Sequence, residues 1–360
     1  MIEALANVSR RNILRSAGIA SIGATLCPFG ARAADVKGPE SVSSAVGRAG
    51  DDATENMSRD VVDALEGAYG RHAGLRRNHT KGVGALGYFI GNPEAARYCR
   101  SMLFSGRKLE VVARFSVAGG DPDVSDRDLS PRGIGLQIRL PDGELHHMTM
   151  LHTPMFFAML PQTFLDKFIA LKVDPATGKP NQVAFKNFLA THRDNDAQFA
   201  LLHKNNPPPS YANCAFFGIH TFRFLDSANR ETMVRFRFQP HDNVKYLSAG
   251  ELASVGNDFL IPALVERAGH GPIKWDMIVS IGEPGDAVDD PTVLWPADRH
   301  EFNAGVLVLE RIIPDARAGS YKINFDPLML SDGIAASNDP VLLFRSPSYA
   351  ISHERRLREI

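Results

Sequence analysis

The sequence predicts an α+β protein built on a closed barrel or a large antiparallel sheet. Two groups of short segments alternate apolar and polar residues with a period of two, which is typical of strands with one buried face. Segments with helical spacing lie before, between and after these groups, and they do not alternate with strands as in βαβ units. With 360 residues, of which 44% are hydrophobic, the chain is long enough for one large core or for two domains.

Each strand group contains two clear segments. The first group has VVARFSV at 111–117 and IGLQIRL at 134–140, and the second has HTFRFL at 220–225 and MVRFRF at 233–238. Since LDSANRE at 225–231 supplies turn residues between the last two segments, we expect these two strands to form a hairpin.

Four segments show the helical spacing of apolar residues. VVDALEGAYG at 61–70 ends in a glycine that can cap a short helix. The other three are QTFLDKFIALK at 162–172, NQVAFKNFLATHRDN at 181–195 and AGELASVGNDFLIPALVERAGHG at 249–271.

Residues 1–33 have the features of an export signal. Paired arginines in SRRNILR at 9–15 precede an apolar run, and ARAAD at 31–35 has small residues spaced as at a cleavage site. This order is typical of a twin-arginine signal, so we expect a periplasmic or otherwise exported protein that uses the export machinery. The run is shorter than the roughly 18 to 20 residues of a spanning helix, and we expect no membrane span. We expect residues 34–60 to be mobile and residues 61–360 to form a single domain.

Charge and cysteine content exclude several classes of protein. Lys and Arg total 40 against 41 for Asp and Glu, so no net field attracts nucleic acid or an anionic membrane surface. The three cysteines form no CxxC pair, which argues against a zinc or iron–sulfur site. Whether Cys99 and Cys214 pair with each other stays open.

Common catalytic motifs are missing from the sequence. There is no phosphate-binding loop, no G-x-G-x-x-G that opens a helix and no G-x-S-x-G elbow. His146, His147 and His152 lack the H-E-x-x-H pattern of a zinc site, and we interpret them as a polar strand edge.

The stretch GLRRNHTKG at 74–82 carries two arginines, a histidine and a lysine just before an apolar run. On the first predicted strand, alternation turns Arg114 and Ser116 to the same face. If that face meets His79, the site combines an imidazole, a hydroxyl and arginines, including Arg76, that suit carboxylates. The alternative, a buried structural histidine with surface arginines, stays open.

The C-terminal stretch RSPSYAISHERR at 345–356 contains a candidate metal ligand. A tyrosine ligates a metal only as phenolate, so its pKa, about 10 when free, must be lowered by a neighbouring cation. Arg345, four residues before Tyr349, is placed to supply that charge.

Eight stretches of the chain, read together, carry a family resemblance. They are RRNHTKGVGALGYF, VVARFSVAGG, SPRGIGLQI, HTPMFFAMLPQTF, FFGIHTFRF, TVLWP, NFDPLMLSDGIAASNDP and RSPSYAISHERR. In this order, from about Gly70 to Arg356, they resemble the haem catalase superfamily, specifically its short, exported branch of catalase-related peroxidases. The resemblance implies an antiparallel β-barrel of about eight strands with surrounding helices and a haem buried at the barrel.

The resemblance also implies a role for each site residue. His79 resembles the distal histidine and Ser116 the serine that hydrogen-bonds it, while Tyr349 resembles the proximal haem ligand. The residues implied to support the cofactor are Arg345, His220 and Asp339 behind the ligand, Arg76, Arg114 and Arg356 at the propionates, and Phe156 and Phe164 on the distal side.

The chain departs from the family pattern at several positions. Leu151 stands where catalases have a catalytic distal asparagine, and leucine cannot donate a hydrogen bond. Asn78 replaces a usual valine and adds a polar group beside the distal histidine. In the ligand loop, Pro347 and Ile351 replace an aromatic residue and an aspartate. Because the chain stops soon after Arg356, we expect the C-terminal helical region of full-length catalases to be missing.

These features predict a haem-dependent peroxidase that reduces hydrogen peroxide with small organic electron donors and retains some catalase activity, in an antioxidant role. His79 is expected to take a proton from peroxide and return it to the leaving oxygen. Reduction by a second peroxide is expected to be weak, because losing one positioned hydrogen bond costs about 10² to 10³ in rate. The alternatives are a true catalase, a haem enzyme that acts on organic hydroperoxides and a non-catalytic haem-binding protein. The implied cofactor is haem b, in a monomer or small homo-oligomer.

Overall fold

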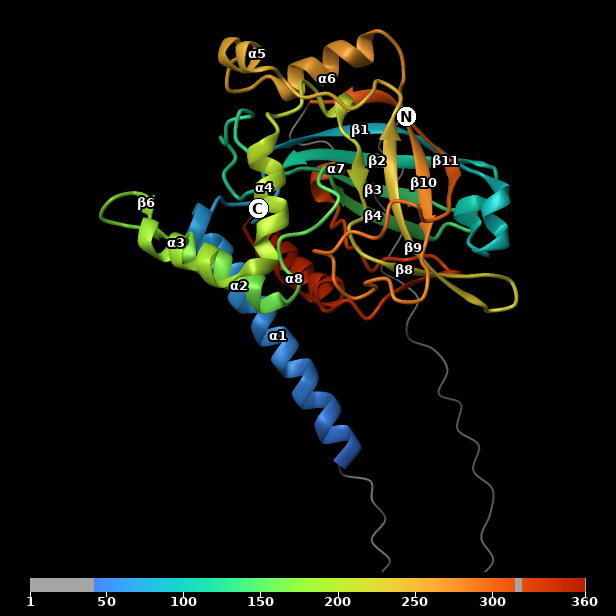
Figure 1. Cartoon of the computed structure of the whole chain (residues 1–360), viewed down its shortest axis with the longest axis horizontal. Coiled ribbons are helices and arrows are strands. Elements are labelled where there is room, and N and C mark those ends of the chain that lie inside the picture. The colour runs from blue at the N-terminus through green and yellow to red at the C-terminus, as the bar shows by residue number, and fades with distance from the viewer. Residues whose placement is uncertain (1–41, 315–318, 360) are drawn as a thin grey trace, which may run out of the picture. The chain divides into compact units, whose positions relative to one another are not determined.

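The computed structural model describes residues 42–314 and 319–359, and a closed antiparallel barrel of eight strands forms its centre (Figure 1). Around the barrel the strand order is β10-β11-β1-β2-β3-β4-β7-β9, and pairing of β9 with β10 closes the ring. The barrel strands are β1 (Gly82–Gly91), β2 (Lys108–Val117), β3 (Arg132–Arg139), β4 (Leu145–Leu151), β7 (Phe216–Phe217), β9 (Glu231–Pro240), β10 (Ile273–Ile281) and β11 (Glu301–Ile313).

Shorter strands and helices complete the described part of the chain. β8 (Phe222–Leu225) and β12 (Ile334–Ala336) extend the sheet beyond β9, and β5 (Val173–Asp174) pairs with β6 (Lys179–Pro180). The α-helices are α1 (Val42–Tyr69), α2 (Pro161–Ala170), α3 (Gln182–Thr191), α4 (Asp196–Lys204), α5 (Ala249–Ser254), α6 (Leu260–Gly269), α7 (Gly319–Lys322) and α8 (Pro340–Leu357). Single 3-10 turns span Pro93–Arg97, Met102–Phe104, Arg193–Asn195 and Tyr211–Asn213.

The barrel interior is filled with apolar side chains. Alternation along β2 and β3 buries Ala113, Phe115, Ile134 and Leu136 inside the barrel, where they join Trp275 of β10 in one core. The same alternation turns the intervening residues of β2, β3 and β4 to the outer face. The functional site is therefore built on the outside of the barrel wall.

A second apolar core joins three helices that cover this outer face. α1 contributes Val61 and Leu65, α2 contributes Phe168, and α8 contributes Val341 and Phe344. Figure 1 shows α8 beside α1 and α2, with α5 and α6 at the other end of the barrel. Each helix presents an apolar stripe to this core, and the polar residues of the site lie at its border.

The predicted fold class is confirmed, and so are most of the predicted elements. The segments 111–117, 134–140 and 233–238 lie in β2, β3 and β9. The hairpin is also confirmed, because β8 pairs with β9 in antiparallel register from Phe222 opposite Val234. The helices predicted at 162–172 and 181–195 are α2 and α3, with α4 continuing after a short 3-10 turn.

Several predictions need correction. The helix expected at 61–70 begins at Val42 and so also includes residues 42–60, whose expected mobility stays a prediction. The segment 249–271 forms two helices, because a capping box at Ser248 and Glu251 starts α5 and the chain leaves the helix after Ser254. The predicted export signal at 1–33 lies outside the described residues.

His146 and His147 were interpreted as a polar strand edge, and that interpretation is wrong. Both lie on β4 and are buried. His146 Nδ1 accepts the backbone N–H of Ser331, and the ring of His147 is hydrogen-bonded to Gln137. Burial lowers the pKa of His146 to about 3. These interactions make the two rings part of the sheet's packing rather than of its surface.

Three further observations complete the fold. Residues 47–360 form one compact unit, while the domain boundary expected at residue 61 stays a prediction. Cys99 and Cys214 are buried free thiols that do not pair. None of the helices in the described ranges is long and apolar enough to cross a membrane.

Candidate active site

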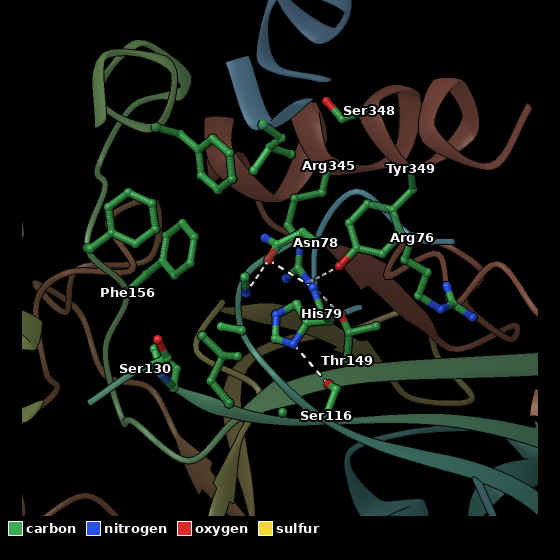
Figure 2. Close-up of a pocket in the computed structure, with 18 of the residues that line it drawn as sticks. Arg76, Asn78, His79, Ser116, Ser130, Thr149, Phe156, Arg345, Ser348 and Tyr349 are labelled. Atoms are coloured by element: carbon green, nitrogen blue, oxygen red, sulfur yellow. Dashed lines mark hydrogen bonds between the residues drawn. The ribbon is translucent and has the colours of Figure 1, made fainter. Parts of the chain in front are cut away.

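A cavity of about 380 Å³ lies between the outer face of the barrel and the helices α1, α2, α4 and α8 (Figure 2). Its size is within the usual range of cofactor and ligand sites, roughly 300 to 1,000 Å³. The wall is mostly apolar. Ten of the twelve predicted site residues line it: Arg76, Asn78, His79, Arg114, Ser116, Phe156, Phe164, Arg345, Tyr349 and Arg356.

One row of residues across the barrel wall sets the floor of the distal side. Ser116 of β2 is in register with Gly133 of β3, which is in register with Leu151 of β4. Directly paired residues of neighbouring strands project to the same face of a sheet. A Cβ at Gly133 would lie 2.9 Å from Cε1 of His79, so only glycine lets the imidazole approach this row. Leu151 therefore projects toward the side on which His79 lies.

His79 is held at both its backbone and its ring. Its φ of +56° is in the left-handed region, and its N–H donates to Oδ1 of Asn78 at 2.9 Å. The same Oδ1 accepts the N–H of Gly119 at 2.8 Å, so Asn78 ties the histidine loop to the chain after β2. Nδ1 of His79 lies 2.9 Å from Oγ of Ser116 (Figure 2).

The imidazole of His79 is neutral at ordinary pH. Burial is the main cause, and the nearby charges of Arg114 and Arg345 reinforce it, so that the pKa falls to about 3. In the tautomer in which Nδ1 donates to Ser116, the lone pair resides on Nε2. The ring can then act as a base.

Arg114 also shapes the histidine loop. Its two terminal nitrogens each donate at 2.8 Å, one to the carbonyl of His79 and the other to that of Thr80. These bonds help to hold the strained backbone at His79. Nε of Arg114 has no hydrogen-bond partner among the described residues.

Tyr349 ends a continuous chain of hydrogen bonds on the other side of the cavity. Nη2 of Arg345 donates to Oη of Tyr349 at 2.9 Å, and its Nη1 lies 2.9 Å from Nε2 of His220. Nδ1 of His220 lies 2.6 Å from Oδ2 of Asp339. The spacing of four residues on α8 puts Arg345 and Tyr349 on one face of the helix.

His220 and Asp339 lie behind the cavity wall and are both buried. Burial lowers the pKa of His220, although the carboxylate of Asp339 opposes the shift. A neutral ring that donates from Nδ1 to Asp339 can accept from Arg345 at Nε2, so every group in the chain has a partner. Asp339 also caps α8, because its Oδ1 accepts the backbone N–H groups of Val341 and Leu342.

Three arginines form the cationic end of the cavity. Buried nitrogens without a hydrogen-bond partner in the described residues are Nε of Arg76, Nε of Arg114 and Nη2 of Arg356. Burial lowers the pKa of all three groups, to about 10 for Arg356. Unpaired buried guanidinium groups are costly unless an anion joins them. This cluster therefore fits a ligand that carries carboxylates.

Aromatic side chains form the opposite end. The rings of Phe156 and Phe164 stack with centroids 6.1 Å apart, and Phe157 lies between them at 4.5 Å and 5.3 Å. Figure 2 shows Phe156 and Ser130 on the side of His79 away from Arg76. The cavity thus has one cationic end, one aromatic end, and a tyrosine and a histidine between them.

These features match the requirements of a haem. Its propionates would meet the unpaired nitrogens of Arg76, Arg114 and Arg356, and its apolar ring would fill the aromatic and aliphatic part of the wall. Tyr349 projects into the cavity with Arg345 as a donor to its oxygen, as a tyrosinate ligand requires. The residues present therefore fit the cofactor.

Sequence reasoning missed two residues that the geometry makes important. Thr149 accepts a hydrogen bond from Nη2 of Arg345 at 2.8 Å, and Gly133 gives His79 its space. The signal for Thr149 was present, because it is two residues from Leu151 on one strand and must share its face. Only the register between strands reveals the contact of Gly133 with His79.

Known proteins are similar to this chain in sequence and in fold. The family model for catalase matches residues 59–359. A catalase-related peroxidase of Synechococcus elongatus is 46% identical over 83% of this chain and 88% of its own length. Another catalase-related peroxidase, of Mycolicibacterium paratuberculosis, is 29% identical over 82% of this chain and 93% of its own length. The solved structure of catalase A from Saccharomyces cerevisiae superposes with a TM-score of 0.74 and 23% identity, over 92% of this chain and 68% of that one.

Proposed function

The chain belongs to the catalase family, and we propose that it is a haem peroxidase that reduces hydrogen peroxide with small organic electron donors. One observation carries this choice within the family. The row of Ser116, Gly133 and Leu151 retains the hydroxyl beside His79 but ends in a side chain that cannot donate a hydrogen bond.

The proposed cofactor is haem b, held by two sets of residues. Tyr349 would be the iron ligand, and Arg76, Arg114 and Arg356 would bind the propionates. When bound, the haem supplies an iron that accepts peroxide and is reduced again by electron donors. Arg345 stabilises the phenolate of Tyr349, while His220 and Asp339 hold Arg345 in position.

His79 moves the proton in the peroxide-cleaving step. Its neutral ring takes a proton from one peroxide oxygen and delivers it to the other, which leaves as water. The contact with Ser116 fixes the orientation of the ring, and the bonds from Asn78 and Arg114 fix its backbone. Burial keeps the base unprotonated until peroxide arrives.

Leu151 affects which molecule acts as the reductant after the first peroxide is cleaved. A second peroxide has His79 as one polar contact but finds no donor at Leu151, so its orientation is poor. An organic donor needs only to deliver electrons and protons, and it is less dependent on that contact. The net reaction is one peroxide plus two donor molecules, each losing one electron and one proton, to give two waters and two donor radicals.

The test measures dioxygen release and donor oxidation together. The haem-loaded protein is given hydrogen peroxide and an excess of an oxidisable phenol. We expect phenol oxidation in proportion to peroxide consumed, with little dioxygen. One dioxygen for every two peroxides would instead indicate a true catalase, and no consumption of peroxide would indicate a haem-binding protein without turnover. Faster consumption of an organic hydroperoxide than of hydrogen peroxide would favour the third alternative.

We also propose that the protein is exported. The support is the order of paired arginines, apolar run and small-residue site in residues 1–33. Replacing Arg10 and Arg11 by lysine should retain the unprocessed chain in the cytoplasm, as seen by fractionation. Equal export of this variant and the natural chain would contradict the proposal.

A further inference from the structure

The charges that line the cavity are all of one sign. The lining contains no aspartate or glutamate among the described residues, whereas five lysine and arginine side chains reach it. They are Arg76, Arg114, Lys167, Arg345 and Arg356. The proposed haem accounts for four of them, through its two propionates and the phenolate of Tyr349. Lys167 is the cation of this set for which the proposed function gives no role.

Lys167 is fixed in place without being neutralised. Its ammonium donates to Oδ1 of Asn195 at 3.0 Å and lies 3.8 Å from the centre of the Phe157 ring. No carboxylate lies within ion-pair distance of it in the part of the chain that the structure describes. Burial lowers its pKa to about 8, against the opposing effect of Asp194, so most of the population is charged at pH 7. At least one of its N–H groups has no acceptor among these residues.

Further aromatic rings lie next to the one that this cation contacts. Phe157 packs against Phe164 at 5.3 Å and Phe168 at 6.3 Å, and Phe199 of α4 lines the same cavity. Such rings offer faces and edges on which another aromatic ring can stack. The wall near Lys167 thus joins an aromatic surface to one positive charge.

This wall also reaches the protein surface. Leu129, in the loop before β3, is 38% exposed, and His203, at the end of α4, is exposed as well. Both line the cavity. Figure 2 shows Ser130, the neighbour of Leu129, on the side of His79 opposite Arg76. The cavity is therefore lined by solvent-exposed residues on the side away from the arginine cluster.

We propose that the wall formed by α2, α4 and the loop before β3 binds the electron donor, and that Lys167 selects donors that are aromatic anions. The fitting chemical class is a phenol that carries a carboxylate. The carboxylate pairs with the ammonium of Lys167 and the ring stacks on Phe157 and Phe199, two rings of this wall that have no predicted role in holding the haem. This assignment rests on the proposed peroxidase function for its chemistry, but the binding itself does not require turnover.

The first test measures binding without peroxide. Calorimetric titration of the haem-loaded protein compares 4-hydroxyphenylacetate with its neutral amide, 4-hydroxyphenylacetamide. We expect the anion to bind about tenfold more tightly to the natural protein, which corresponds to one well-placed charge contact. In Lys167→Met this preference should disappear, and in Lys167→Arg part of it should remain. Lys186→Met, which removes an exposed lysine of α3, is the matched control and should leave the preference unchanged.

A second test separates this inference from the proposed function. Donor oxidation by Lys167→Met should show a raised KM for the anion and an unchanged KM for the amide, with the haem absorption of the natural protein. Equal affinity of the natural protein for both probes, or a preference that survives Lys167→Met, would overturn the inference. If both phenols bind as predicted but neither is oxidised, the inference stands and the peroxidase function fails.

Discussion

The two sides of the cavity differ in how completely their polar groups are connected. On the proximal side, Tyr349, Arg345, His220 and Asp339 form an unbroken chain with contacts of 2.6 to 2.9 Å. On the distal side, His79 contacts Ser116, but the row across the barrel wall ends in Leu151. The proximal side is suited to hold a ligand and its charge, whereas the distal side has a base in His79 but no hydrogen-bond donor at Leu151.

This difference separates two requirements that act together in a catalase. Holding a haem and cleaving the first peroxide need the tyrosine and a base. Orienting a second peroxide as the reductant needs an additional hydrogen-bond donor near the base. Because the chain keeps the first set and has a leucine in place of the donor at position 151, the contrast accounts for a peroxidase on a catalase fold.

The largest expected effect comes from removing the distal base. His79→Gln should lower the rate of peroxide consumption by about 10² to 10⁴, the usual contribution of a general acid–base group. Haem absorption should remain, because the proximal chain is untouched. Loss of bound haem in this variant would show that the two sides are not independent.

Substitution of Asp339 disrupts the buried hydrogen-bond chain on the proximal side. In Asp339→Asn the single side-chain oxygen can cap α8 or accept from His220, but it cannot do both. One buried donor is then left without a partner, which should cost about 1 to 3 kcal/mol in the free energy of unfolding. Urea unfolding measures this cost, with Asp332→Asn as the control, since that carboxylate is exposed and pairs with Arg100 at the surface. Equal effects of the two variants would contradict the role of the buried chain.

The pH dependence tests the neutral state of His79. Because its pKa is about 3, the rate of peroxide cleavage should not change as pH falls from 8 to 5. An inflection near pH 6.5, the value of a free histidine, would show that the ring is not desolvated as described.

The lowered pKa of His79 also makes the free energy of unfolding depend on pH. The unfolded chain binds a proton at His79 below about pH 6.5 and the folded chain does not, so stability is present above that pH and is lost toward pH 3. The loss should be about 1.4 kcal/mol per pH unit in this window. His79→Gln should reduce the slope of unfolding free energy against pH by that amount.

The smallest expected effect is at Ser116. Ser116→Ala removes the hydroxyl that orients the ring of His79, a contribution of about 1 kcal/mol or roughly fivefold in rate. Steady-state kinetics should show the change in peroxide cleavage with no change in haem content. Ser125→Ala, which removes a half-buried loop hydroxyl that donates to Asn257, serves as the control, and an equal loss in both variants would remove Ser116 from the mechanism.

Local patterns predicted much of the fold, and the failures have physical causes. Alternation in β2 and β9 was clear because one face is apolar and the other carries arginines. β1 was missed because GVGALGYFIG is nearly apolar throughout, so its sequence shows no alternation of apolar and polar residues. The break between α5 and α6 falls at VGNDF (255–259), where Gly256, Asn257 and Asp258 are typical turn residues, and it was missed because the segments on both sides have helical spacing.

For the site, the sequence predicted some of the residues and missed others. The structure brings His79, Tyr349 and Arg345 to one cavity, as expected from residue type and short spacing, and their roles stay predictions. Arg114 was expected at a propionate, and the structure adds that its terminal nitrogens bind the loop of His79. Thr149 and Gly133 depend on strand register, and Lys167 depends on how α2 and α4 surround the cavity. Those contacts form between segments far apart in the chain, so no local pattern contains them.

The most direct test of the central claim is the dioxygen yield of Leu151→Asn beside that of the natural protein. Both haem-loaded proteins receive hydrogen peroxide without an organic donor, and dioxygen is measured against peroxide consumed. We expect a low rate of dioxygen release from the natural protein and a clear rise in the variant, because the new amide can orient a second peroxide. An unchanged rate in the variant, or a natural protein that already releases one dioxygen for every two peroxides as fast as the variant, would contradict the account.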